Sequence, residues 1–177
     1  EYSLNFSLDS VDVAPSAIAD LSAFSVPNST QTGLSWRATA EDGASGAILG
    51  GHYFIQTATS AAATFSPASA QISFSTNTAP GMLQNYLLSG LLGNASHYFR
   101  LWLQDTGGSI SGDSNLAQLY VLPNPPAGLV TGAVSSSTAA VGWSEGSNNA
   151  PIEYSVWIDT DAFEPVVLVS PFKEPSD

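Results

Sequence analysis

Residues 91–105 read LLGNASHYFRLWLQD and residues 116–121 read LAQLYV, with a Gly/Ser-rich loop between them. Apolar residues alternate with others along both segments, which predicts two β-strands joined by a turn. Leu91 comes just before a turn and Tyr98 just after it, a pairing typical of the corner that closes an all-β sandwich. We therefore expect the Tyr98 ring to pack inward and its hydroxyl to bond to the backbone upstream.

Residues 1–13 also alternate between apolar and polar side chains, apart from a one-residue slip at Ser10 that a bulge would explain. Pro15 ends this stretch, because proline is poorly tolerated inside a sheet. The pattern predicts a strand with one apolar face, formed by Tyr2, Leu4, Phe6 and Leu8.

The features around Trp36 recur around Trp143, at a period of roughly 107 residues that suits one sandwich domain. In both places an apolar strand, a turn rich in Ser and Thr, and a strand bearing Trp follow one another, and Tyr154 then corresponds to Tyr53. The second copy has no counterpart of residues 91–121, so we expect an incomplete second sandwich.

The order of these features resembles a fibronectin type III domain. The resemblance covers about Pro15 to Leu122 and the front half of a second copy, and a long stretch between Ala58 and Thr78 departs from the family pattern. The residues that carry it are Trp36, Tyr53, Pro80-Gly81, Leu91 with Tyr98, and Asp105 with Gly107-Gly108.

The resemblance implies an antiparallel, seven-stranded, immunoglobulin-like β-sandwich that serves as a spacer, adhesion or binding module and carries no catalytic residues. We expect an extended strand at 1–14, a complete sandwich at 15–122, a stiff Pro-rich linker at 123–126 and a partial second sandwich at 127–177. The expected core of the first sandwich contains Leu34, Trp36, Tyr53, Ile55, Leu91, Tyr98 and Leu101, and Trp143 with Tyr154 are expected in the core of the second.

The composition excludes several classes of function. Charged residues make up 10% of the chain, against roughly 25% in ordinary soluble domains. The net charge is −12 with only 3 Lys and Arg, which argues against binding to nucleic acid or to an anionic membrane surface. No run of apolar residues is long enough for membrane insertion as a helix.

The sequence offers no convincing catalytic, cofactor or metal site. It contains no Cys, and His52 and His97 are predicted to be ordinary surface histidines because nothing in their spacing supports a metal site. Oxygen ligands at alternate positions can suit Ca²⁺, but the full loop pattern is absent, so a solvated acidic turn is the favoured interpretation of Asp159, Asp161 and Glu164.

Two kinds of residue in the sequence suggest contact with glycans. Exposed tryptophans can stack on sugars, but Trp36 and Trp143 occupy the expected core positions, which leaves Trp102 and Trp157 as candidates. Three Asn-x-Ser/Thr sequons offer acceptors for N-glycosylation, at Asn5, Asn28 and Asn94.

These observations favour a non-catalytic, extracellular or cell-surface structural protein whose partners are copies of itself. We expect residues 1–13 to pair with the incomplete second sandwich of a neighbouring copy, so that subunits join head to tail. The alternative is a spacer module, or a ligand- or carbohydrate-binding module, of a larger secreted adhesin or polysaccharide-degrading enzyme.

Overall fold

The computed structural model describes residues 12–27, 31–43 and 45–156 of the 177-residue chain. The described residues form two compact units. The first contains the described residues up to Leu91 together with Ser96–Tyr120, and the second contains Leu92–Ala95 and the described residues from Val121 onward.

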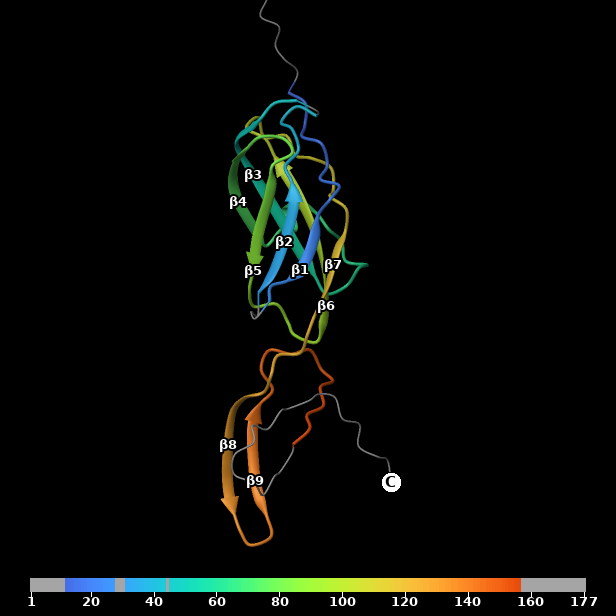
Figure 1. Cartoon of the computed structure of the whole chain (residues 1–177). Helices are drawn as coiled ribbons and strands as arrows, with labels where there is room; N and C mark the ends of the chain where they lie inside the picture. Colours follow the sequence, from blue (N-terminus) through green and yellow to red (C-terminus); the bar gives the residue numbers. More distant parts are fainter. Residues whose placement is uncertain (1–11, 28–30, 44, 157–177) are drawn as a thin grey trace, which may run out of the picture. The chain divides into compact units, whose positions relative to one another are not determined.

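The secondary structure is almost entirely β (Figure 1). Nine strands and one 3₁₀ helix occur among the described residues. The elements are β1 (Ser22–Ser25), β2 (Thr32–Arg37), β3 (Ile48–Ala58), η1 (Pro67–Ser69), β4 (Ile72–Thr78), β5 (Leu83–Leu88), β6 (Ala95–Gln104), β7 (Ala117–Val121), β8 (Ala127–Val134) and β9 (Ala139–Ser144).

The first unit is a sandwich of two sheets. One sheet has the strand order β1-β2-β5 and the other has the order β4-β3-β6-β7. The pairs β1/β2, β2/β5, β3/β4 and β3/β6 are all antiparallel. This arrangement confirms the predicted antiparallel immunoglobulin-like sandwich, and β8 and β9 form a separate antiparallel hairpin.

The core lies between the two sheets of the first unit. Trp36 and Tyr53 are buried with their rings in edge-to-face contact, at a centroid distance of 5.1 Å and an interplanar angle of 77°. Such aromatic pairs stabilise a core beyond their buried area. Both residues were expected in the core, as were three others that are also buried: Leu34, Ile55 and Leu101.

The prediction for the corner is wrong by one residue. Phe99, Leu101 and Leu103 are buried at alternate positions of β6, so Tyr98 points to the opposite side of the strand and is only half-buried. Because side chains alternate strictly along a strand, the inward position nearest the corner falls to His97, which is buried and stacks on Phe99. His97 is therefore not the surface histidine that the sequence predicted, and Leu91 is only partly buried against the core.

The sequence from Ala61 to Ala70 predicts a short edge strand and a loop, and the connection between β3 and β4 in the structure differs from this. It contains turns and the helix η1, and the edge strand is β4. The Gln56 side chain holds this connection, because its Nε2 donates to the Thr64 carbonyl at 3.1 Å and its Oε1 accepts from the Ser66 N–H at 2.8 Å. A buried amide thus replaces the backbone partners that a strand would have supplied.

The two lateral edges of the sandwich are closed by different chemistry. On one side, Phe74 of β4 and Tyr86 of β5 stack across the sheets with ring centroids 4.9 Å apart. On the other side, the Asn115 amide accepts from the Leu21 N–H and donates to the Leu21 carbonyl, both at 2.8 Å. An aromatic pair and an amide bridge therefore join the sheets at opposite edges.

The second unit contains the β8–β9 hairpin. Trp143 contacts Tyr154 edge to face, with centroids 5.7 Å apart, which repeats the Trp36–Tyr53 pair of the first unit. Both residues are only half-buried, unlike the core positions predicted for them, and residues 151–156 form no strand. Every residue of β8 is exposed, so no sheet among residues 121–156 covers the hairpin in the way that the facing sheet covers the equivalent strands of the first unit.

Candidate functional site

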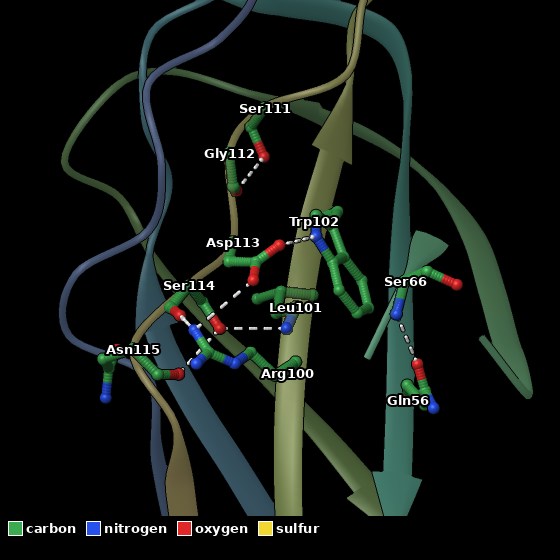
Figure 2. A network of polar contacts seen from close by, with 10 residues as sticks. All are labelled: Gln56, Ser66, Arg100, Leu101, Trp102, Ser111, Gly112, Asp113, Ser114 and Asn115. Carbon is green, nitrogen blue, oxygen red and sulfur yellow. Dashed lines mark hydrogen bonds and ion pairs between the residues drawn. The ribbon is translucent and has the colours of Figure 1, made fainter. Parts of the chain in front are cut away.

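A network of polar side chains lines one flank of β6 (Figure 2). The Ser111 hydroxyl accepts from the Leu103 N–H at 3.0 Å, and the Ser114 hydroxyl accepts from the Leu101 N–H at 2.9 Å. The backbone N–H groups of the same two serines donate to the carbonyls of Leu103 and Leu101. The serines thus continue the ladder of β6 before β7 begins, where regular strand pairing is absent.

Trp102 lies on the outward side of β6 and is nevertheless buried. Its indole Nε1 donates to Asp113 Oδ1 at 2.9 Å, and in Figure 2 its ring extends toward the side on which Gln56 and Ser66 lie. Arg100 Nη1 lies 3.9 Å from Asp113 Oδ2 and also donates to the Ser114 carbonyl. These contacts fix the 111–115 segment on the sheet, and they leave the Trp102 ring unavailable for stacking on a sugar.

The other tryptophans give no sugar-stacking platform in the first unit either. Trp36 is buried in the core, and Trp143 is half-buried against Tyr154 in the second unit. Trp157 lies outside the described residues. The described residues therefore support packing as the role of their tryptophans.

The histidines and acidic residues do not form a metal centre in the described part of the chain. His52 is exposed on β3, whereas His97 is buried on β6. No group of three or more His, Asp or Glu residues suited to hold an ion occurs among residues 12–27, 31–43 and 45–156. The acidic group formed by Asp159, Asp161 and Glu164 lies outside those ranges.

Tyr53 is the ionisable group whose environment changes it most clearly. Burial raises the pKa of its phenol above the usual value near 10, because the charged form would lose its hydration, and the neighbouring Trp36 indole opposes this shift weakly. The Tyr53 hydroxyl has no well-aligned hydrogen-bond partner in the core. A neutral phenol in this place stabilises the fold by packing and offers no acid–base chemistry at physiological pH.

One of the three predicted glycosylation sites lies among the described residues. Asn94 has a positive φ of 53°, and its Nδ2 donates to the carbonyls of Asn149 at 2.9 Å and Pro151 at 3.1 Å. The amide nitrogen that would carry a glycan is thus engaged within the second unit. Asn5 and Asn28 lie outside the described residues, so their glycosylation stays a prediction.

Asn94 belongs to a cluster of asparagines in the second unit. The Asn148 amide accepts from the Asn124 N–H at 2.7 Å and donates to the Asn124 carbonyl at 3.0 Å. Asn124 Nδ2 in turn donates to the Ser147 carbonyl, and Gly93 exchanges backbone hydrogen bonds with Ser147 and Asn149. Uncharged amides therefore organise the chain directly after the first sandwich.

The predicted donor face cannot be placed, because Tyr2, Leu4, Phe6 and Leu8 lie outside the described residues. The described chain begins at one pole of the first sandwich. Asp12 Oδ2 accepts from the Ser109 hydroxyl at 2.9 Å, and the Val13 N–H donates to Asp42 Oδ1 at 3.3 Å. Ser109 lies in the turn after β6, so residues 12–13 are held at the pole where that turn lies.

The predicted acceptor, the second unit, carries exposed apolar residues in its described part. Thr131 is the register partner of Val141, and Val141 and Trp143 share a side of the hairpin because they are two residues apart. Leu129 is 66% exposed and Val134 is 72% exposed, and Val130, Val141 and Val156 are exposed as well. Leu129 and Val141 lie on one side of the hairpin, Val130 lies on the other, and Val156 lies outside it. Exposed apolar side chains of this kind are typical of an interaction surface.

Most of the polar residues that hold the first sandwich together could not be recognised from the sequence. Gln56, Ser111, Ser114 and Asn115 act through side-chain hydrogen bonds to backbone groups far away in the chain. The pattern Ser-x-x-Ser-Asn at 111–115 was visible, but in a chain rich in Ser and Asn it carries little information.

Comparisons with known proteins give fold-level similarity. No protein-family model matches the chain, and no curated protein sequence matches it significantly. Solved structures that resemble it include titin domains A168-A170, at 17% identity and a TM-score of 0.40 over 62% of this chain. The FN1-FN3 domains of chicken CNTN1 align at 15% identity and a TM-score of 0.42 over 90% of it. The chain spans 32% of the length of the titin structure and 55% of the CNTN1 structure.

Among the described residues, no helix is long and apolar enough to cross a membrane. The first unit pairs its strands as two antiparallel sheets of three and four strands, with Trp36 of β2 packed against Tyr53 of β3 in the core. The first unit is thus an antiparallel β-sandwich with a fold like that of fibronectin type III domains.

Proposed function

We propose that this chain is a non-catalytic, extracellular structural module that joins copies of itself head to tail, by donating residues 1–13 to the second sandwich of the next copy. The exposed apolar surface of the β8–β9 hairpin carries this proposal. An isolated two-stranded hairpin is at best marginally stable in water, so such a surface needs a further strand or layer. The alternating face of Tyr2, Leu4, Phe6 and Leu8 has the chemistry to provide it.

The position of Asp12 supports pairing between copies rather than within one. Asp12 is held at the pole where β6 turns toward β7, and β7 then runs toward the opposite pole, from which the chain continues. The eleven residues of β3 run the length of the sandwich, roughly 33 Å at 3.3 Å per residue.

Tyr2 lies ten residues before Asp12, so it reaches at most about 36 Å from that pole. The donor segment would therefore use nearly its whole length to pass its own first sandwich. Little of it would remain beyond the pole at which β7 ends, whereas a strand of another copy can approach the first pole directly.

Cysteine cross-linking tests the proposal, because the natural chain contains no Cys. Val141→Cys would be combined in turn with a cysteine at each position from Tyr2 to Leu8. Intermolecular disulfides are expected at alternate positions on the apolar face, and not at Ser3, Asn5 or Ser7. Cross-links with no such alternation would contradict strand donation.

Deletion of residues 1–13 provides the second arm. The shortened chain is expected to lose open-ended assembly in light scattering and to bind an added peptide with the sequence of residues 1–13. The same peptide with Leu4→Lys and Phe6→Lys is the control and is expected not to bind. Unchanged assembly of the shortened chain would refute the proposal, as would a full chain that stays monomeric at high concentration.

The second candidate function is a spacer module in a larger secreted protein. The asparagine cluster around Asn124 favours it. The Asn148 amide binds both the N–H and the carbonyl of Asn124, which lies in the Pro-rich 123–126 segment, and so stiffens that segment. A spacer would keep the full chain monomeric, so the light-scattering measurement separates the two functions.

A further inference from the structure

Strands β3, β4 and β5 on one flank of the first sandwich contribute no charged side chain, and the charged group beside β5 is Arg37 of β2, which donates to the Gly81 carbonyl at 3.0 Å. Although the chain has 15 Asp and Glu, no Asp, Glu, Lys or Arg occurs between Asp42 and Arg100, the part of the sequence that forms β3, β4 and β5. For a protein with a net charge of −12, this flank is where another copy can approach without direct repulsion between carboxylates.

β5 is an edge strand on this flank. It pairs with β2 on one side, continuously and without a bulge, and ends the order β1-β2-β5. Natural edge strands are commonly protected by charges, prolines or bulges, and β5 contains none of these. None of the described strands pairs with its other side, so β5 is available to pair with another strand.

The backbone direction identifies which groups of β5 are free to pair. The Ala38 N–H donates to the Met82 carbonyl at 2.9 Å, so the Met82 carbonyl points toward β2. Backbone groups alternate in direction along a strand, so those of Leu83, Asn85 and Leu87 point away from β2, to the open edge. The Leu83 carbonyl there already accepts from Gln84 Nε2 at 3.1 Å, and its second lone pair is the one that can pair with another strand. Leu83 is 55% exposed and Leu87 is 54% exposed on the outer face of the sheet.

We propose that β5 pairs with β5 of a second copy in antiparallel register centred on Asn85, which joins the two three-stranded sheets into one continuous sheet. In this register Asn85 lies opposite Asn85 of the second copy, and Leu83 lies opposite Leu87. By symmetry Leu87 also lies opposite Leu83, so there are three pairs, and all are of the hydrogen-bonded kind. A two-fold rotation exchanges the two copies and leaves the arrangement unchanged, as a closed dimer requires.

The same register also brings together exposed apolar side chains on the outer faces of the two three-stranded sheets. Phe24, Gly33 and Leu87 form a row across β1, β2 and β5, and the Phe24 ring lies directly over Gly33. Pairing extends this row onto Leu83 of the second copy, so that exposed apolar side chains of both copies become contiguous. The contact is lateral and closes at two copies, and it does not depend on donation of residues 1–13.

The other edge strand of the same flank is a poorer partner and supplies the control. β4 is also uncharged, but its exposed residues, Ser73, Ser75 and Asn77, are polar. Asn77 Oδ1 is already occupied by the Gly50 N–H at 2.6 Å. Pairing through β4 would bury no comparable apolar area.

A single cysteine in the full chain tests the register. Asn85→Cys is expected to form a disulfide-linked dimer on mild oxidation, because opposite residues in this register have Cα atoms about 5.5 Å apart. Ser75→Cys on β4 is the matched control and is expected to cross-link far less. Equal cross-linking of the two variants, or none at residue 85, would overturn the proposal.

Charge variants at the same position distinguish pairing from chance collision. Asn85→Glu and Asn85→Lys each place like charges opposite one another, and each is expected to weaken the lateral dimer by at least about tenfold. An equimolar mixture of the two variants should restore it as a mixed dimer in native mass spectrometry. If either variant alone dimerises like the natural chain, or if the mixture forms no mixed dimer, β5 is not the contact.

The β5 dimer and the donation of residues 1–13 can be refuted independently of one another. A chain that lacks residues 1–13 should still form the β5 dimer, and Asn85→Glu should still form disulfides between residue 141 and the donor face. A β5 contact that disappears in the shortened chain would show that it is a consequence of strand donation, which would overturn its independence.

Discussion

The side chain of Asn115 forms two hydrogen bonds of 2.8 Å with the backbone of Leu21, one accepted and one donated, across a separation of 94 residues. The amide thus imitates a peptide group and joins the segment before β1 to the segment before β7. Gln56 and Asn148 bracket other backbone groups in the same way. In a chain with few charges, amides do the work that ion pairs do elsewhere.

Asn115→Ala should lower the free energy of unfolding by about 1–2 kcal/mol, since it leaves the N–H and carbonyl of Leu21 without their partner. Asn115→Asp keeps the acceptor but removes the donor, and it should destabilise the protein more at neutral pH than at acid pH, where the carboxyl becomes a donor again. Urea unfolding at pH 4 and pH 7 measures both. Gln118→Ala, at an exposed position of β7, is the control and should have little effect.

The second prediction concerns which side chains of β6 point into the core. Phe99→Ala should cost about 3–5 kcal/mol, because a buried ring is lost from the core. Tyr98→Ala, one residue away and only half-buried, should cost clearly less. If Tyr98→Ala destabilised the protein more than Phe99→Ala in thermal or urea unfolding, the tyrosine, and not the phenylalanine, would occupy the inward position.

Tyr53 predicts how stability depends on alkaline pH. Burial raises its pKa in the folded state above the unfolded value near 10. Above about pH 10 the unfolded chain releases this proton before the folded one does, so stability is unaffected below that pH and falls above it. Tyr53→Phe should flatten this fall relative to the natural protein in unfolding experiments from pH 8 to pH 11. An identical pH profile for both proteins would contradict the assignment.

Gly51 should not tolerate a side chain. A Cβ at this position would lie 2.5 Å from the Gln104 carbonyl oxygen, a backbone atom that cannot move aside cheaply. The residue sits where β3 shifts register against β4. Gly51→Ala should therefore destabilise the fold by more than about 2 kcal/mol.

Gly112→Ala is the matched control for Gly51, because the nearest atom to its Cβ would be a methyl group at an ordinary contact distance of 3.6 Å. It should leave the melting temperature nearly unchanged. If both substitutions were tolerated, the close approach of β3 and β6 at Gly51 would be wrong.

The sequence by itself determined the class of fold. Alternating apolar residues, the order of Trp36, Tyr53 and the 91–105 segment, and the repeat at Trp143 were enough to predict an antiparallel sandwich and a second unit, because two-residue periodicity is a local property of strands. The absence of charge from Asp42 to Arg100 could also be read directly.

Only the tertiary structure decided which side of a strand faces the core and which polar groups meet. In residues 97–103 almost every side chain is large, so the composition did not show whether Tyr98 or Phe99 faces the core. Packing between the two sheets decided which of the alternating side chains point inward. Burial of Trp102, the bridge from Asn115 to Leu21 and the open edge of β5 all depend on contacts between residues distant in sequence. Such contacts leave no periodic signal in the chain, because a side-chain amide or indole finds its partner through the fold and not through its neighbours.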